Sequence, residues 1–86
     1  MEAEFQTACD WMKDNAGKIS KQEDLLPPYG FFKQATEGDN KTAEPMKLNI
    51  KAHRKWDIWK KQAGMSKEDA MKNYVEAVNT LKAQVK

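Results

Sequence analysis

Aromatic and basic side chains occur together in the stretch YGFFKQATEGD, residues 29 to 39. Tyr29, Phe31 and Phe32 supply three rings, and Lys33 follows about one helical turn after Tyr29. A ring can stack on a flat base and a phenol can donate a hydrogen bond to a phosphate, while an ammonium group supplies the opposite charge. A flat base joined to phosphates is a nucleotide, which is the ligand that these residue types favour.

Further basic residues stand beside aromatic ones later in the chain. Lys55 precedes Trp56, and Lys47, Lys51 and Lys55 are spaced by four. A helix that spans all three lysines would place like charges along one flank, at a cost of a few tenths of a kcal/mol per pair. An anionic partner would remove this repulsion. The ordinary alternative for Lys33 and Lys55 is that their stems cover apolar surface at the border of the core.

Long nucleic acid is a poor match to this pattern. The net charge is only +2, and the sequence has neither an extended basic stripe nor a glycine-rich phosphate loop. Tyr74 adds one more ring that could flank a single nucleotide. We therefore expect a small ligand whose phosphates are held by side chains, and no nucleic acid partner.

The sequence offers little for catalysis. Cys9 is the single cysteine and His53 the single histidine, so no internal disulfide can form and a metal site would need mainly carboxylate ligands. Cys9 lies on an apolar stripe, where a buried free thiol is ordinary. We read Asp57 and Asp69 as solvated or capping charges. No nucleophile with a partner base is recognisable, and we predict a non-enzyme without metal or cofactor.

The length and composition fit one soluble domain, residues 1–86. A chain of 86 residues buries roughly 60 to 65% of its unfolded surface, too little for two cores. No apolar run approaches the ~20 residues of a membrane span, and the first residues lack the layout of a secretion signal. We expect a cytoplasmic monomer without stable membrane insertion.

Apolar residues recur at the period of amphipathic helices in four segments. They are residues 2–16, 25–37, 51–63 and 66–85. In the second segment Pro27 and Pro28 disfavour the α conformation of the residue before each, so we place its start at Pro27. Ser66 is the expected cap of the fourth segment. The predicted fold class is all-α.

The long link at residues 38–50 predicts the topology. Thirteen residues can span ~40 Å when extended, whereas the second helix is only ~20 Å long. The chain can therefore return to the end at which that helix began, and the second and third helices can run parallel. The other links are short and favour antiparallel neighbours. The expected order is up, down, down, up.

The chain resembles the acyl-CoA-binding protein family, also called diazepam-binding inhibitor. Four stretches carry the resemblance, which covers almost the whole chain: AEF at 3–5, FKQATEGD at 32–39, KWDIW at 55–59 and SKEDAMKNYVEAV at 66–78. It implies a four-helix bundle of up-down-down-up order. It also implies high-affinity binding of medium- to long-chain acyl-CoA thioesters by an intracellular carrier and pool former that does not react with them.

The resemblance further implies a set of binding residues. Positions that match Tyr29, Lys33 and Lys55 hold the adenine and 3′-phosphate of CoA, with Phe32 beside them and Tyr74 flanking the nucleotide. Gly30 and Phe31 complete the lining segment. Lys13 and Lys51 match further positions near the polar part of the ligand, and Leu25 and Leu26 match places beside the acyl chain.

Two departures from the family pattern concern Phe32 and the pair Pro27 and Pro28, and a third is a loop before the second helix that is one residue longer. Phe32 stands where the family commonly has tyrosine, so a hydroxyl contact worth about 1 kcal/mol or more is missing and a weaker nucleotide grip is expected. Pro27 and Pro28 occupy positions that are helical in familiar members. The rival interpretation is a helical interaction module that binds an acidic helix of a partner, but it does not explain why rings and lysines recur on three helices.

Overall fold

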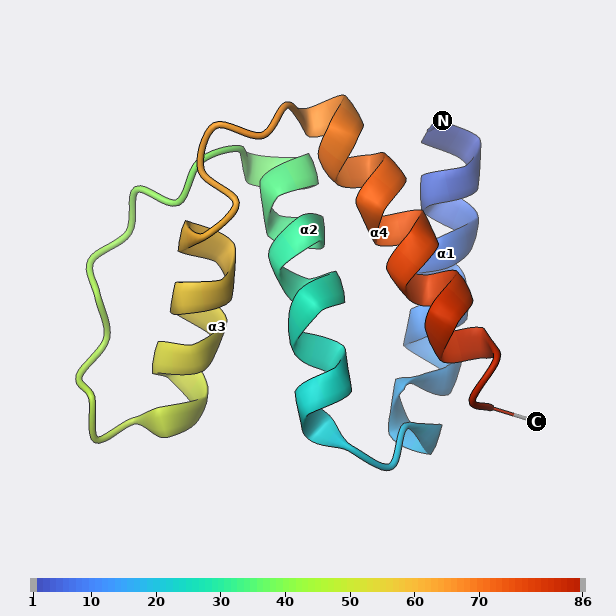
Figure 1. Cartoon of the computed structure of the whole chain (residues 1–86), viewed down its shortest axis with the longest axis horizontal. Coiled ribbons are helices and arrows are strands. Elements are labelled where there is room, and N and C mark those ends of the chain that lie inside the picture. The colour runs from blue at the N-terminus through green and yellow to red at the C-terminus, as the bar shows by residue number, and fades with distance from the viewer. Residues whose placement is uncertain (1, 86) are drawn as a thin grey trace.

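The computed structural model describes residues 2–85 and contains four α-helices in that range (Figure 1). The helices are α1 (Glu2–Asn15), α2 (Leu26–Glu37), α3 (Ile50–Lys60) and α4 (Lys67–Lys82). Two short 3-10 helices, Ala16–Lys18 and Gln22–Leu25, connect α1 to α2. No residue between 2 and 85 is in a strand, so the all-α fold class is confirmed.

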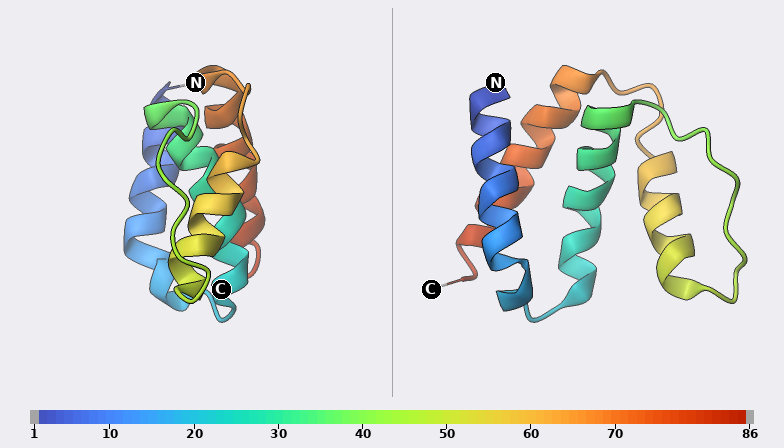
Figure 2. Two further views of the ribbon diagram at one scale, coloured as in Figure 1. Left: turned by 90° about the vertical axis from the view of Figure 1, so that its left-hand side faces the viewer. Right: turned by 180° about the vertical axis from the view of Figure 1, so that it is seen from behind.

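The helices follow the predicted up-down-down-up order. In Figure 1 α2 and α3 run in one direction and α1 and α4 in the other. Figure 2 shows the segment between α2 and α3 passing along the outer side of α3 to its far end. This return is why α2 and α3 can be parallel neighbours.

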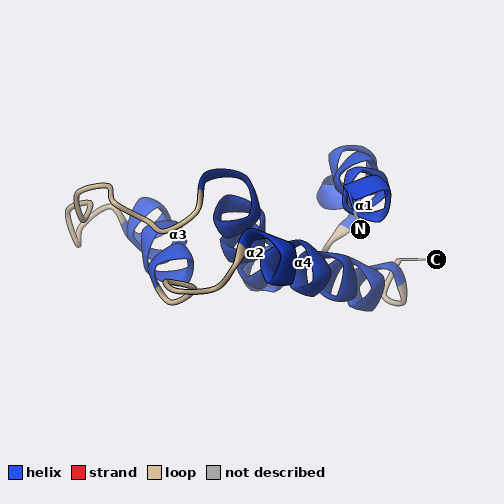
Figure 3. Ribbon diagram, turned by 90° about the horizontal axis from the view of Figure 1, so that it is seen from above, coloured by secondary structure: helices blue, strands red, loops and turns tan. Residues whose placement is uncertain are grey.

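The four helices are not equivalent in the bundle. Seen from above in Figure 3, α3, α2 and α4 form a row, and α1 lies to one side of that row next to α4. The closest helix packing is between α2 and α4, between α2 and α3, and between α1 and α4. Because α1 packs mainly on α4, its side toward α2 remains available for a cavity.

Helix α2 begins one residue before the predicted start. Leu26 is its first residue, and Pro27 and Pro28 lie in the first turn. The backbone N–H groups of a first turn have no acceptor within the helix, so proline loses no helical hydrogen bond there. The helix ends as predicted at Gly38, whose φ of 81° is a left-handed conformation that favours glycine.

Helix α3 is shorter at its C-terminal end than predicted. It runs from Ile50 to Lys60 rather than from 51 to 63, since the Gln62 N–H donates to Trp59 O at 3.0 Å and the chain tightens into turns. At the other end the Asn49 side chain caps the helix. Lys47 therefore lies outside α3, so of the three lysines spaced by four only Lys51 and Lys55 are on the helix.

Helix α4 has the predicted N-terminal cap. The Ser66 hydroxyl accepts a hydrogen bond from the Asp69 N–H at 3.1 Å. Tyr74 and Val78 are buried on its apolar face. The helix ends at Lys82 rather than at residue 85, the end of the predicted segment.

Three aromatic rings from three helices meet in the core. The ring centroids of Phe5 and Tyr74 are 5.1 Å apart, and those of Phe32 and Tyr74 are 5.8 Å apart. Small residues beside the rings, Ala8 and Ala70 among them, let the helices approach closely. This cluster joins α1, α2 and α4.

Two tryptophans of α3 hold the long connection. Trp56 Nε1 donates to Thr42 O at 3.0 Å, and Trp59 Nε1 donates to Gly38 O at 2.8 Å. Asn40 is 2% exposed, donates to Trp56 O and accepts from the Thr42 N–H and hydroxyl. The first part of the connection is thus fixed against α3. Trp59 is buried.

Candidate functional site

A cavity of about 820 Å³ opens beside α1 and α2, and residues from all four helices line it. Its size is within the usual range for small-molecule sites. Its apolar wall includes Phe5, Met12, Leu25, Leu26 and Phe32. Phe5 is buried and the other four are half-buried. The interior therefore offers apolar surface to a ligand.

Leu25 and Leu26 reach the cavity despite the following prolines. Leu25 ends the second 3-10 helix and Leu26 begins α2. Pro28 is buried and lines the same cavity. The early helix start thus leaves both leucines on the wall of the cavity.

The rim of the cavity is cationic. Lys13 comes from α1, and Lys51, Arg54 and Lys55 come from α3. All four side chains are exposed, whereas Glu23 is the only carboxylate among the described lining residues. An anion at this rim would meet an excess of positive charge in a partly enclosed site.

A ring and an ammonium group meet on the same rim. Lys55 Nζ lies 5.4 Å from the centroid of the Tyr29 ring, a cation–π distance that joins α3 to α2. Close contact between these helices depends on Gly30, where a Cβ would lie only 2.8 Å from Ile58 O. Gly30 is buried at this contact and is not a lining residue. It brings α3, and so Lys55, toward Tyr29.

Two weak acids, Cys9 and Tyr74, line the cavity and stay neutral at neutral pH. Burial, followed by the influence of Cys9, raises the pKa of Tyr74 well above its usual value. Burial also raises the pKa of the Cys9 thiol, although a hydrogen bond with Tyr74 opposes the shift. A thiol with a raised pKa is a poor nucleophile. These groups shape and polarise the wall and provide no activated nucleophile.

Comparison with known proteins identifies related sequences. A family model described as Acyl CoA binding protein matches residues 2–78. The rat protein "Diazepam-binding inhibitor-like 5" is 44% identical over 81 residues, which are 94% of this chain and 92% of the relative. The Drosophila melanogaster "Acyl-CoA-binding protein homolog" is 40% identical over 81 residues, 94% of this chain and 93% of that protein.

A solved structure is similar in three dimensions as well. The crystal structure of Oryza sativa acyl-CoA-binding protein 2 superposes with a TM-score of 0.87 and 38% sequence identity, covering 96% of this chain and 89% of that one. The chain belongs to the acyl-CoA-binding protein family. Membership of this family supports acyl-CoA binding, and the resemblance seen in the sequence is confirmed.

Most of the residues inferred from the acyl-CoA-binding protein family meet at the cavity. They are Lys13, Leu25, Leu26, Tyr29, Phe32, Lys51, Lys55 and Tyr74. Phe31 is half-buried against the core and is not among the lining residues. The structure therefore gathers eight of these residues and leaves Gly30, Phe31 and Lys33 beside the cavity.

Lys33 has other partners in this structure. Its ammonium is bonded to the Glu37 carboxylate and lies 5.0 Å from the centroid of the Trp59 ring. Trp59 belongs to α3 and donates to Gly38 O at the start of the connection. A phosphate that uses Lys33 would have to compete with Glu37.

Arg54 is a cavity residue that sequence reasoning missed. It follows Lys51 by three positions and so shares a helix face with it, which is the signal that could have identified it. Among residues 2–85 no three His, Cys, Asp or Glu side chains are grouped to hold a metal. No helix of that range has the length and apolar character needed to cross a membrane.

Proposed function

We propose that this chain binds medium- to long-chain acyl-CoA thioesters with high affinity and serves as their intracellular carrier and pool former, without catalysing a reaction. The observation that supports the proposal is a single cavity with an apolar interior and a cationic rim. An acyl-CoA has the matching halves, a phosphorylated nucleotide and an alkyl chain.

The nucleotide half is proposed to bind at the rim. Tyr29 supplies a ring next to the Lys55 ammonium, and Lys51 and Arg54 add positive charge on the same helix. Stacking and charge-assisted hydrogen bonds are the interactions available there. Lys33 would join the phosphate contacts after leaving Glu37, as the family resemblance implies.

The alkyl half is proposed to lie against Leu25, Leu26 and Met12 in the interior. Burial of one methylene is worth ~0.8 kcal/mol. Each two further carbons would then tighten binding about tenfold until the apolar surface is covered. Free CoA should bind much more weakly than its long-chain esters, and free fatty acid should bind poorly because it lacks the nucleotide.

The proposal also covers the setting of the activity. We infer that the chain acts as one acyl-CoA-binding domain, as a monomer in the cytoplasm, in the transport of acyl groups for fatty acid metabolism. It would do so without a cofactor, nucleic acid or stable membrane insertion. Native mass spectrometry of protein purified from its own cells would detect retained acyl-CoA and give the subunit number directly.

Titration calorimetry tests the binding itself. Palmitoyl-CoA, CoA and palmitate are titrated into the same ligand-free protein. We expect palmitoyl-CoA to bind by far the tightest, since it alone contacts both the rim and the interior. Equal affinity for palmitoyl-CoA and either fragment would contradict the proposal.

A further inference from the structure

The exposed large hydrophobic side chains of residues 2–85 all lie in one short segment. Met46 is 73% exposed, Leu48 is 88% exposed and Ile50 is 60% exposed. They occupy the end of the long connection and the first residue of α3. Single exposed apolar residues are ordinary, but three within five positions form a patch that water does not favour.

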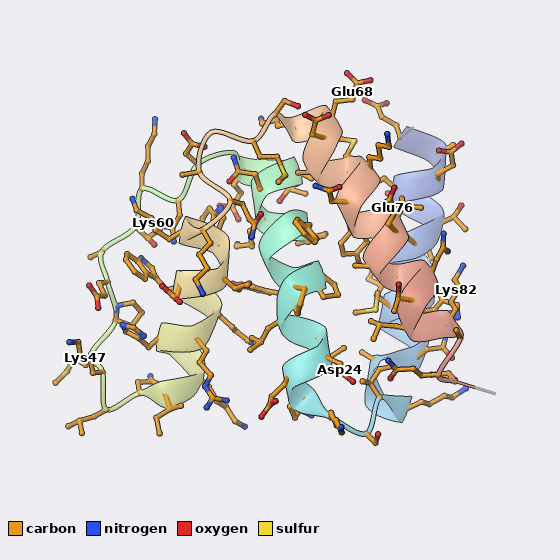
Figure 4. The ribbon with its side chains drawn as sticks, viewed as in Figure 1. Asp24, Lys47, Lys60, Glu68, Glu76 and Lys82 are labelled. Atoms are coloured by element: carbon orange, nitrogen blue, oxygen red, sulfur yellow. The ribbon has the colours of Figure 1, made fainter. Side chains whose placement is uncertain are left out.

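Basic residues alternate with these apolar ones. Lys47 and Lys51 stand between and after them, and both are exposed. Figure 4 shows Lys47 on the outer edge of the connection, on the opposite side of the molecule from α1. The nearby carboxylate of Glu44 is already bonded to His53 at 2.7 Å. The net local charge is therefore positive.

The geometry points to an anionic lipid surface as the partner of this patch, which we call the 46–51 turn. The Asn49 N–H donates to Met46 O at 2.9 Å, so the segment is a defined turn that projects its side chains. Aliphatic side chains can enter the boundary between headgroups and acyl chains while adjacent lysines contact anionic headgroups. Protein interfaces, in contrast, are enriched in aromatic residues and arginine and depleted in lysine.

The 46–51 turn lies next to the cavity rim, so docking to lipid could assist ligand transfer. Ile50 precedes Lys51, which lines the cavity rim together with Arg54. Docking would bring this part of the rim close to the lipid surface, where an amphipathic ligand could pass between bilayer and cavity. Only this use depends on the proposed function; the docking rests on the patch alone.

Vesicle sedimentation with the ligand-free chain tests the inference. Vesicles of phosphatidylcholine alone are compared with vesicles of mixed phosphatidylcholine and phosphatidylserine. We expect binding to the mixed vesicles, weakened by salt, and little binding to phosphatidylcholine alone. Leu48→Asn should reduce binding about tenfold, and Lys47→Gln about fivefold.

Lys72→Gln is the matched control, because it removes the same charge from an exposed position of α4. It should bind as the parent does. Leu48→Asn should keep the parent's thermal midpoint, since the side chain it replaces is exposed. Absence of binding to the mixed vesicles, or equal binding by Leu48→Asn and the parent, would overturn the lipid assignment.

Sedimentation velocity separates the other possible occupant. A concentration-dependent dimer that Leu48→Asn abolishes would assign the 46–51 turn to a second copy of the chain and overturn docking to lipid. Palmitoyl-CoA titration of Leu48→Asn is independent of both results. Failure of vesicle docking with normal palmitoyl-CoA binding would therefore refute this inference and leave the proposed function standing.

Discussion

Replacement of Gly30 by alanine tests how α2 and α3 are held together. The new Cβ would lie 2.8 Å from Ile58 O and 3.1 Å from Ile58 Cγ1. The first of these atoms is backbone and cannot rotate away. Ile58 O also accepts a hydrogen bond from Gln62 Nε2 at 3.1 Å, so a shift of the carbonyl disturbs the end of α3 as well.

Two opposing effects set the size of the change. Alanine is favoured over glycine inside a helix by about 1 kcal/mol. Overpacking costs typically 1–3 kcal/mol, and a clash with backbone belongs at the upper end of this range. We therefore expect Gly30→Ala to lower the free energy of unfolding by about 1 to 2 kcal/mol. In a domain of this size, that corresponds to a decrease of roughly 4 to 16 °C in Tm.

Gly17→Ala is the matched control for this measurement. A Cβ at Gly17 has nothing within 4 Å, and Gly17 is not among the glycines with positive φ. The substitution should be neutral or stabilise the protein by about 0.4–1 kcal/mol. Both variants are unfolded with urea and by heating, and circular dichroism follows the loss of helix.

Palmitoyl-CoA titration of Gly30→Ala adds a second measurement. A displaced α3 would carry Lys51 and Lys55 away from Tyr29, so affinity should fall although Gly30 does not line the cavity. If Gly30→Ala is as stable as Gly17→Ala, the close contact between α2 and α3 does not require a glycine at position 30. Normal stability with lost affinity would instead indicate that Gly30 contacts the ligand itself.

Three further outcomes are expected. Lys55→Gln should weaken binding of every acyl-CoA about tenfold, whatever its chain length, and reduce the salt dependence, as measured by calorimetry beside Lys72→Gln; a loss that grows with chain length would contradict the rim assignment. Glu37→Gln should tighten palmitoyl-CoA binding about twofold at low salt, because it removes an i,i+4 ion pair worth ~0.3–0.5 kcal/mol that holds Lys33 away from the ligand. If neither Glu37→Gln nor Lys33→Gln changes the affinity for palmitoyl-CoA, Lys33 does not belong to the site. Because the pKa of Tyr74 is raised in the folded state, the unfolded chain releases this proton first, and stability should fall as pH rises above about 10; Tyr74→Phe should lose less stability there, and parallel pH curves of urea unfolding would refute the burial of the phenol.

Local sequence was sufficient for most of the fold. The apolar period placed the four helices within one to three residues of their bounds, and Ser66 and Gly38 act as the predicted cap and stop. These features depend on neighbours in the chain. The errors fall at helix ends, such as the tightened turns after Lys60, where hydrogen bonding competes between helical and turn patterns.

The connection shows what local patterns could not provide. Nothing in its sequence predicts that Asn40 is buried, since asparagine is normally exposed in a loop. Its burial depends on Trp56 and Thr42 offering hydrogen-bond partners at the same point. Likewise, Gln34 is buried in α2 because its amide reaches Asp39 and Met65.

At the candidate site, local sequence patterns likewise could not predict the contacts of the lysines. The sequence indicated that Lys33 and Lys55 border apolar stripes beside rings, and the length of the link allowed α3 to run parallel to α2. It did not specify which ring each ammonium meets. Lys55 contacts Tyr29, and Lys33 contacts Glu37 and Trp59. The contacts between helices depend on the distance between α2 and α3. That distance is set by tertiary packing and not by the apolar period within one helix.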